Sequence, residues 1–219
     1  TPFVVQFTVT GYPRALEPAV MEWRRAIDEI QHAASRHGPK VVVWRYDPVF
    51  LSDLTPESFH IDQVSRLAED LAGATDEMVV SFAHLYRKTR RNTERAASKH
   101  GFEWSDPDAE AKRRLLSSLG QIAAARGIRP TLCSQPDLLT SEYNAARCID
   151  LDRLSQIAGA PVKGRQKGNR PGCLCAESRD IGAYDTCPHG CVYCYAVTSQ
   201  ETAKRRFRIH DAAADTLFP

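Results

Sequence analysis

Hydrophobic residues in the first 160 positions fall into short runs, separated by longer segments with helical periodicity. The runs are rich in β-branched and aromatic side chains and nearly free of polar residues, which is typical of strands buried on both faces. The pattern predicts four strands, Phe3–Thr10, Lys40–Tyr46, Met78–Ala83 and Ile128–Cys133. Between them, apolar residues recur every three or four positions and predict helices over Pro18–His37, Asp62–Leu71 and Asp108–Arg126.

Alternation of strands with helices predicts a parallel sheet, because each strand returns to its neighbour through a helix. The spacing of the units fits either part of a (β/α) barrel or an open sheet. Four such units do not close a barrel. We therefore predict an α/β fold with an incomplete, TIM-barrel-like (β/α) sheet, and we expect further βα units before Thr1, which is not a methionine.

The pattern changes near residue 160, where the apolar periodicity ends. Residues Lys163–Gly172 have the composition of a loop or linker, and a cysteine-rich region follows them. We predict two domains, a partial barrel-like domain over residues 1–160 and a basic loop with a cysteine-rich iron–sulfur module over residues 161–219. Within the second, Lys204–Arg208 is expected on a helix.

Composition narrows the class of protein. The chain has 219 residues, of which 42% are hydrophobic and 26% charged, as in ordinary globular proteins. No apolar run approaches the length of a membrane span, and Thr1–Thr10 lacks the regions of a signal peptide. We expect a cytoplasmic protein with no membrane partner. The net charge of +2 excludes a general polyanion binder, although cations can still cluster locally.

The cysteines carry the main functional signal. Five of the seven lie between residues 173 and 194, in a chain that does not look secreted, so metal or redox chemistry is favoured over disulfides. Cys187, Cys191 and Cys194 have C-x3-C-x2-C spacing. Three thiolates from one short loop suit a 4Fe–4S cluster with one open iron, whereas structural zinc normally takes four ligands. The spacing, with Tyr193 before the last cysteine, resembles the cluster motif of the radical S-adenosylmethionine enzymes.

The four remaining cysteines are numerous enough for a second centre. Cys173 and Cys175 point to one side of an extended chain, and Cys133 ends the fourth predicted strand, where α/β folds build their sites. We expect Cys133, Cys148, Cys173 and Cys175 to hold a second centre, a 4Fe–4S cluster more readily than zinc. The alternative for Cys133 and Cys148 is a pair of buried apolar thiols.

Charged residues follow the second predicted strand at its carboxyl end. Arg45 and Asp47 interrupt an apolar run there and are candidates for positioning a substrate, since a guanidinium binds carboxylates and phosphates in bidentate fashion. The alternative is an ion pair that fixes the loop. Two basic segments, Arg87–Arg91 and Lys204–Arg208, are candidates for contacts with phosphates of a nucleic acid, or else are solvated helix faces.

Motifs along nearly the whole chain carry a family resemblance. They are Trp44–Pro48, Ser81–Arg90, Cys148–Asp150, Cys173–Cys175, Asp180–Tyr184 and Cys187–Ala196. Together they resemble the bacterial family catalogued as domain of unknown function 1848. The resemblance implies a C-terminal cysteine cluster similar to that of radical S-adenosylmethionine domains, and an additional N-terminal segment that is absent here.

The two resemblances together imply an iron–sulfur protein similar to the radical S-adenosylmethionine enzymes. Its 4Fe–4S cluster would have one open iron, and that iron would bind S-adenosylmethionine. They also imply an electron donor of the ferredoxin or flavodoxin type, while the substrate, a small molecule or a nucleic acid, is not identified. In radical S-adenosylmethionine enzymes the motif follows the first barrel strand, whereas here it follows the barrel-like region. Either the cysteine loop caps the same barrel mouth, or its cluster transfers electrons without S-adenosylmethionine. The alternative function is a nucleic-acid-binding or redox module with structural zinc or a structural cluster.

Overall fold

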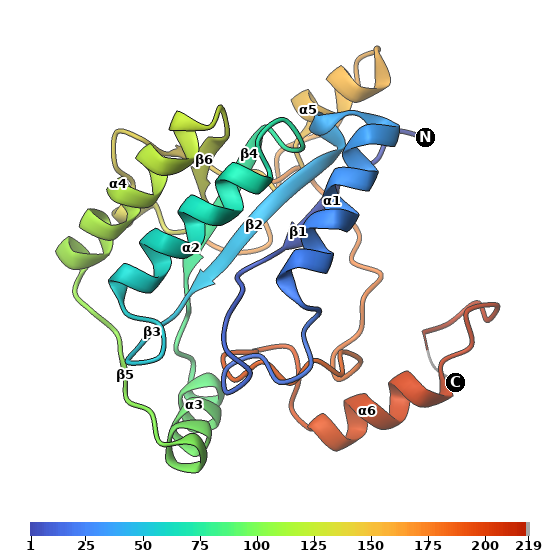
Figure 1. Cartoon of the computed structure of the whole chain (residues 1–219). Coiled ribbons are helices and arrows are strands. Elements are labelled where there is room, and N and C mark those ends of the chain that lie inside the picture. The colour runs from blue at the N-terminus through green and yellow to red at the C-terminus, as the bar shows by residue number, and fades with distance from the viewer. Residues whose placement is uncertain (218–219) are drawn as a thin grey trace. The chain divides into compact units, whose positions relative to one another are not determined.

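The computed structural model describes residues 1–217, which form two compact units (Figure 1). The sheet unit comprises residues 1–11, 22–82 and 105–178. The cysteine-loop unit comprises residues 12–21, 83–104 and 179 onward. Cys133, Cys148, Cys173 and Cys175 therefore belong to the sheet unit, whereas Cys187, Cys191 and Cys194 belong to the cysteine-loop unit.

A parallel sheet of five strands organises the sheet unit, in the order β1-β2-β4-β6-β7. The strands are β1 (Val5–Thr8), β2 (Val42–Val49), β4 (Glu77–Phe82), β6 (Arg129–Leu132) and β7 (Asn144–Ala145). The first four coincide with the predicted strands, so the predicted parallel α/β sheet is confirmed. Two short strands, β3 (Leu51–Ser52) and β5 (Trp104–Ser105), complete the set over residues 1–217.

Residues 1–217 contain six α-helices. The sheet unit holds α1 (Trp23–His37), α2 (Glu57–Asp70), α4 (Ala109–Ala125) and α5 (Leu151–Ala158), and the cysteine-loop unit holds α3 (Arg87–His100) and α6 (Gln200–Ile209). The predicted helix over Pro18–His37 begins later than expected, because the Glu22 carboxylate caps its first turn by accepting from the Arg24 amide. None of these helices is long and apolar enough to cross a bilayer.

Helices α1, α2 and α4 lie along one face of the sheet (Figure 1). Side chains alternate between the two faces along each strand. Trp44, Tyr46, Met78 and Val80 therefore pack against these helices in the main core. The intervening residues, such as Val43 and Val79, form a second cluster on the opposite face. That second cluster also includes Cys133, Ala146, Val4 and Cys148, and we call this face of the sheet the thiol face.

His60 is a buried polar residue of the main core. The Tyr46 hydroxyl donates to His60 Nδ1 over 2.8 Å, and His60 Nε2 lies 3.2 Å from the Phe50 carbonyl oxygen, to which it can donate. Both ring nitrogens are thus satisfied when the imidazole is neutral. Burial lowers the pKa of His60 to about 4.

Acidification is therefore expected to destabilise the fold through His60. Its unfolded-state pKa is about 6.5, so only the unfolded chain gains a proton between pH 6.5 and 4, and the free energy of unfolding falls by about 3 kcal/mol across that window. Above pH 6.5 the group contributes no pH dependence. Urea denaturation at a series of pH values measures the effect, with His60→Gln as the matched variant. Equal slopes in the two proteins would contradict this assignment.

Candidate metal centres

Arg45, Asp47 and Ser81 meet on the thiol face near the carboxyl ends of β2 and β4. Arg45 Nε donates to Asp47 Oδ2 over 3.1 Å, and its Nη2 binds the same oxygen. The Ser81 hydroxyl donates to the other oxygen, Asp47 Oδ1. Burial alone would lower the pKa of Arg45, but the Asp47 carboxylate, followed by Cys148, raises it above its ordinary value. The guanidinium is therefore a permanent cation, held in one orientation by Asp47.

Two guanidinium groups from distant parts of the sheet unit contact thiols. Arg45 Nη1 lies 3.0 Å from Cys148 Sγ, and Arg170 Nη2 lies 3.3 Å from Cys133 Sγ. The Ser134 hydroxyl lies 3.7 Å from the same Cys133 sulfur. A cation that donates to sulfur favours the thiolate over the thiol.

The four cysteines of the sheet unit contact one another in succession. The Cys133 side chain forms a hydrogen bond with that of Cys148. Cys148 forms a second with Cys175, and Cys175 forms a third with Cys173. All four are free thiols, with Cys133 and Cys175 buried and the other two half-buried. The hydrogen bond from Cys148 lowers the pKa of Cys175 to about 7, whereas the bond to Cys148, followed by burial, raises the pKa of Cys133. The structure thus brings the predicted second-centre residues together.

Backbone contacts hold the segment of Cys173 and Cys175 beside Cys148. The Ala176 amide donates to the Ile149 carbonyl, and the Lys167 amide donates to the Cys175 carbonyl, each over 3.0 Å. At Gly168 a Cβ atom would lie 2.1 Å from the Cys173 carbonyl oxygen, so only glycine permits this approach. The loop is therefore shaped to return its two cysteines to the thiol face.

The three-cysteine loop, Cys187–Cys194, is anchored to the connection that directly follows β1. The Ala19 amide donates to the His189 carbonyl, and the Val192 amide donates to the Leu16 carbonyl, each over 3.0 Å. The Tyr193 hydroxyl also donates to Glu17, whose side chain is buried. These contacts all lie within the cysteine-loop unit.

The three thiols of this loop differ in exposure. Cys187 is exposed, whereas Cys191 and Cys194 are half-buried. Burial, followed by the neighbouring Glu17 carboxylate, raises the pKa of Cys191 to about 12. Cys191 is therefore protonated at neutral pH, and binding of a metal here would release its proton.

Both sets of cysteines offer sulfur ligands, which favour iron–sulfur clusters and zinc. Three thiols in one loop match a 4Fe–4S cluster with an open iron, and four thiols match a second cluster or zinc. Among residues 1–217, however, no three or more Cys, His, Asp or Glu side chains are arranged as a metal would require. Side-chain movement toward a common point is thus part of any metal-binding proposal.

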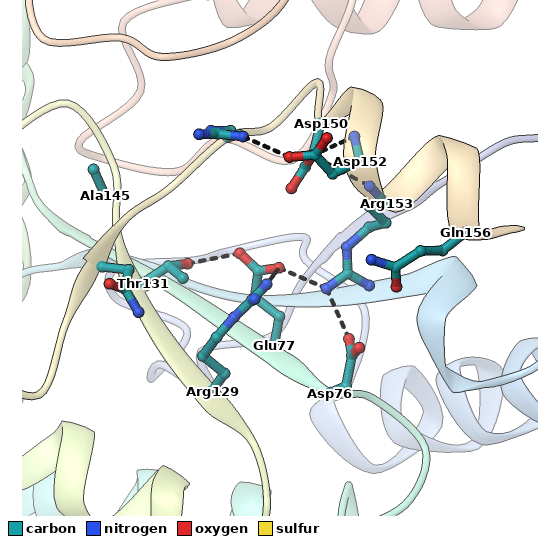
Figure 2. Close-up of a pocket in the computed structure, with 11 residues that line it drawn as sticks. Asp76, Glu77, Arg129, Thr131, Ala145, Asp150, Asp152, Arg153 and Gln156 are labelled. Carbon is teal, nitrogen blue, oxygen red and sulfur yellow. Dashed lines mark hydrogen bonds and ion pairs between the residues drawn. The ribbon is translucent and has the colours of Figure 1, made fainter. Parts of the chain in front are cut away.

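A polar cavity of about 400 Å³ lies at the opposite, amino end of the strands (Figure 2). Buried Glu77 lies at its centre and accepts from Thr131 Oγ1 over 2.9 Å, from Arg129 over 2.7 Å and from Arg153 over 2.6 Å. Arg153 also pairs with Asp76 at 2.8 Å. The sequence did not point to this network, which ties α5 to the start of β4.

These features define an α/β protein with a parallel sheet and two groups of free cysteines. The chain belongs to the family described as Domain of unknown function (DUF1848), whose family model matches residues 1–196 and so includes all seven cysteines. No curated protein and no solved structure matches the chain.

Proposed function

We propose that this chain is an iron–sulfur protein of the radical S-adenosylmethionine type. Cys187, Cys191 and Cys194 would hold a 4Fe–4S cluster, and the four cysteines of the sheet unit would hold a second centre, preferably another 4Fe–4S cluster. The observation that carries the proposal is the anchoring of the three-cysteine loop to residues 12–21, the connection that follows β1. Radical S-adenosylmethionine enzymes carry their cysteine motif after the first barrel strand. Here the motif comes late in the sequence, but its loop is hydrogen-bonded to residues 12–21, which follow β1 along the chain.

The order of the strands supports a barrel-like architecture. The five strands lie in the sheet in the same order as in the sequence, and every neighbouring pair is parallel. This is the order found around a (β/α) barrel, and it differs from doubly wound sheets, in which the order reverses at a switch point. We propose that the sheet is part of an incomplete barrel.

The protein's own residues would bind and orient the first cluster. Glu17 fixes Tyr193 within the motif, and Lys88 Nζ donates to the Tyr195 carbonyl over 3.0 Å, just after the last cysteine. When bound, the cluster would supply the one-electron reduction of S-adenosylmethionine that leads to hydrogen abstraction from a substrate. An electron donor of the ferredoxin or flavodoxin type is the partner that this chemistry requires.

Metal content and cofactor cleavage test the proposal together. The protein is purified without oxygen, reconstituted with iron and sulfide, and assayed for iron, sulfide and zinc, with visible and electron spin resonance spectra. About eight irons per chain supports two 4Fe–4S clusters, and about four removes the second centre. Zinc without sulfide overturns both. Reduction with dithionite in the presence of S-adenosylmethionine should yield 5′-deoxyadenosine, and its absence from a cluster-loaded protein would leave only an electron-transfer role.

A stripe of cations favours nucleic-acid binding as a second candidate function. A basic residue recurs at every fourth position of α3, and all four are exposed: Arg87, Arg91, Arg95 and Lys99. Within residues 1–217 none of them forms an ion pair. Like charges four residues apart destabilise a helix, so the stripe is better explained by an external anion. Exposed Tyr86, stacked on His84 before the helix, adds an aromatic surface for a base.

Removing three of these cations is expected to weaken binding of a single-stranded oligonucleotide and to reduce its salt dependence. If each arginine neutralises one phosphate, the Arg87→Ala, Arg91→Ala, Arg95→Ala variant should lose about 2 from the slope of log K against log salt. Fluorescence anisotropy between low and moderate salt measures the slope. The control replaces three exposed arginines of α1, Arg24, Arg25 and Arg36, at the same change in net charge. Equal loss in both variants would indicate nonspecific attraction.

A further inference from the structure

Arg45 is bound on two sides by groups of the protein itself. One edge of its guanidinium binds Asp47, and Nη1 reaches Cys148 Sγ at 3.0 Å. Its side chain is only 18% exposed. A substrate anion would have to displace either the carboxylate or the sulfur to bind it, so the geometry favours a role toward the thiols.

Arg170 supplies a second cation to the neighbouring thiol. It comes from the loop that returns Cys173 and Cys175, yet its Nη2 lies 3.3 Å from Cys133 Sγ. Cys133 and Cys148 also contact each other. Two arginines from separate segments thus converge on two adjacent sulfur atoms. The pKa values of Cys133 and Cys148 are both raised, so the two cations face thiols in the metal-free protein and would balance thiolate charge once these sulfur atoms bind a metal.

The donor to Cys148 is fixed independently of any bound group. The Ser81 hydroxyl holds Asp47, and Asp47 holds Arg45. Two side chains on adjacent strands therefore orient Arg45 Nη1 toward Cys148 Sγ. Such supporting hydrogen bonds tune the ligands of a metal centre as well as orienting them.

We propose that Arg45 and Arg170 are hydrogen-bond donors to two sulfur ligands of the second centre and raise its reduction potential. This inference rests on the proposed second cluster. A cluster with four thiolates carries net negative charge, and reduction adds one more electron. Cations that donate to its sulfur atoms stabilise the reduced form more than the oxidised form, which makes reduction easier. Arg45 and Arg170 are thus positioning and tuning residues.

The test uses full-length protein in which Cys187, Cys191 and Cys194 are replaced by alanine, so that only the second centre contributes. Redox titration followed by electron spin resonance gives its midpoint potential. Replacing Arg45 or Arg170 with Gln should retain the iron and lower the potential. A tenfold loss of preference for the reduced form corresponds to 59 mV for a one-electron couple. Arg36→Gln, on exposed α1, is the control and should leave the potential unchanged.

Each outcome separates this inference from the proposed function. Retained iron with an unchanged potential in both arginine variants would overturn the tuning role while leaving the second cluster in place. Absence of iron and sulfide from the three-alanine protein itself would overturn the second cluster and the inference with it. If Arg45→Gln loses its iron, Arg45→Lys keeps the charge with a less favourable donor, and a smaller fall in potential is then expected.

Discussion

Replacing Cys133 and Cys148 with serine is expected to remove about half of the iron from the reconstituted protein, from about eight atoms to about four per chain. The two thiols contact each other, and Cys148 also contacts Cys175, so their loss leaves too few sulfur ligands for a 4Fe–4S cluster. The three-cysteine loop belongs to the other unit and should keep its own iron. Iron and sulfide assays after anaerobic reconstitution measure the change.

The reciprocal variant and a local control make this result specific. Replacing Cys187, Cys191 and Cys194 should remove the other half of the iron and all cleavage of S-adenosylmethionine. Ser134→Ala removes a hydroxyl that lies 3.7 Å from the Cys133 sulfur without removing a thiol, and should leave the iron content unchanged. Full iron content after the loss of both Cys133 and Cys148 would instead identify them as buried apolar thiols.

The fold could be predicted wherever an element leaves a long enough pattern. Four strands and three helices of the sheet unit show clear hydrophobic periodicity, because each buries a face in the core. Several elements were missed for physical reasons. The strands β3 and β5 have only two residues each, and the buried residues of α3 are two threonines, which leave no apolar periodicity. The strand β7 has only two residues, and α5 is a short helix whose place depends on tertiary contacts, namely those of Arg153.

The candidate site was predictable in its residue types but not in its contacts. Thiol spacing pointed to the cysteines, and the sudden change from apolar to charged residues in β2 pointed to Arg45 and Asp47. Arg170 and Glu17 left no signal, since each lies in an irregular segment without periodicity. Their contacts arise only when the chain folds back, bringing Arg170 to Cys133 and Glu17 to Tyr193.

Replacing Arg153 with alanine is expected to reduce the free energy of unfolding by about 3–5 kcal/mol, the range for breaking a buried ion pair by removing one partner. The side chains of Arg153 and Glu77 are 6% and 5% exposed, and their atoms lie 2.6 Å apart. Without Arg153, Glu77 keeps Arg129 and Thr131 but loses its most buried cation, and α5 loses its anchor to β4. Urea denaturation at neutral pH measures the loss.

Two comparisons distinguish a buried charge effect from a general loss of contacts. Arg126→Ala breaks an exposed pair with Glu69, whose atoms lie 3.8 Å apart, and should cost less than about 1 kcal/mol. The double replacement Arg153→Met, Glu77→Met removes both charges. If the cost of the single variant comes from a buried carboxylate that has lost one of its two cations, the double variant should lose much less than the sum of the single methionine variants. Simple additivity would mean that α5 is held by packing, and that the Glu77–Arg153 pair contributes little.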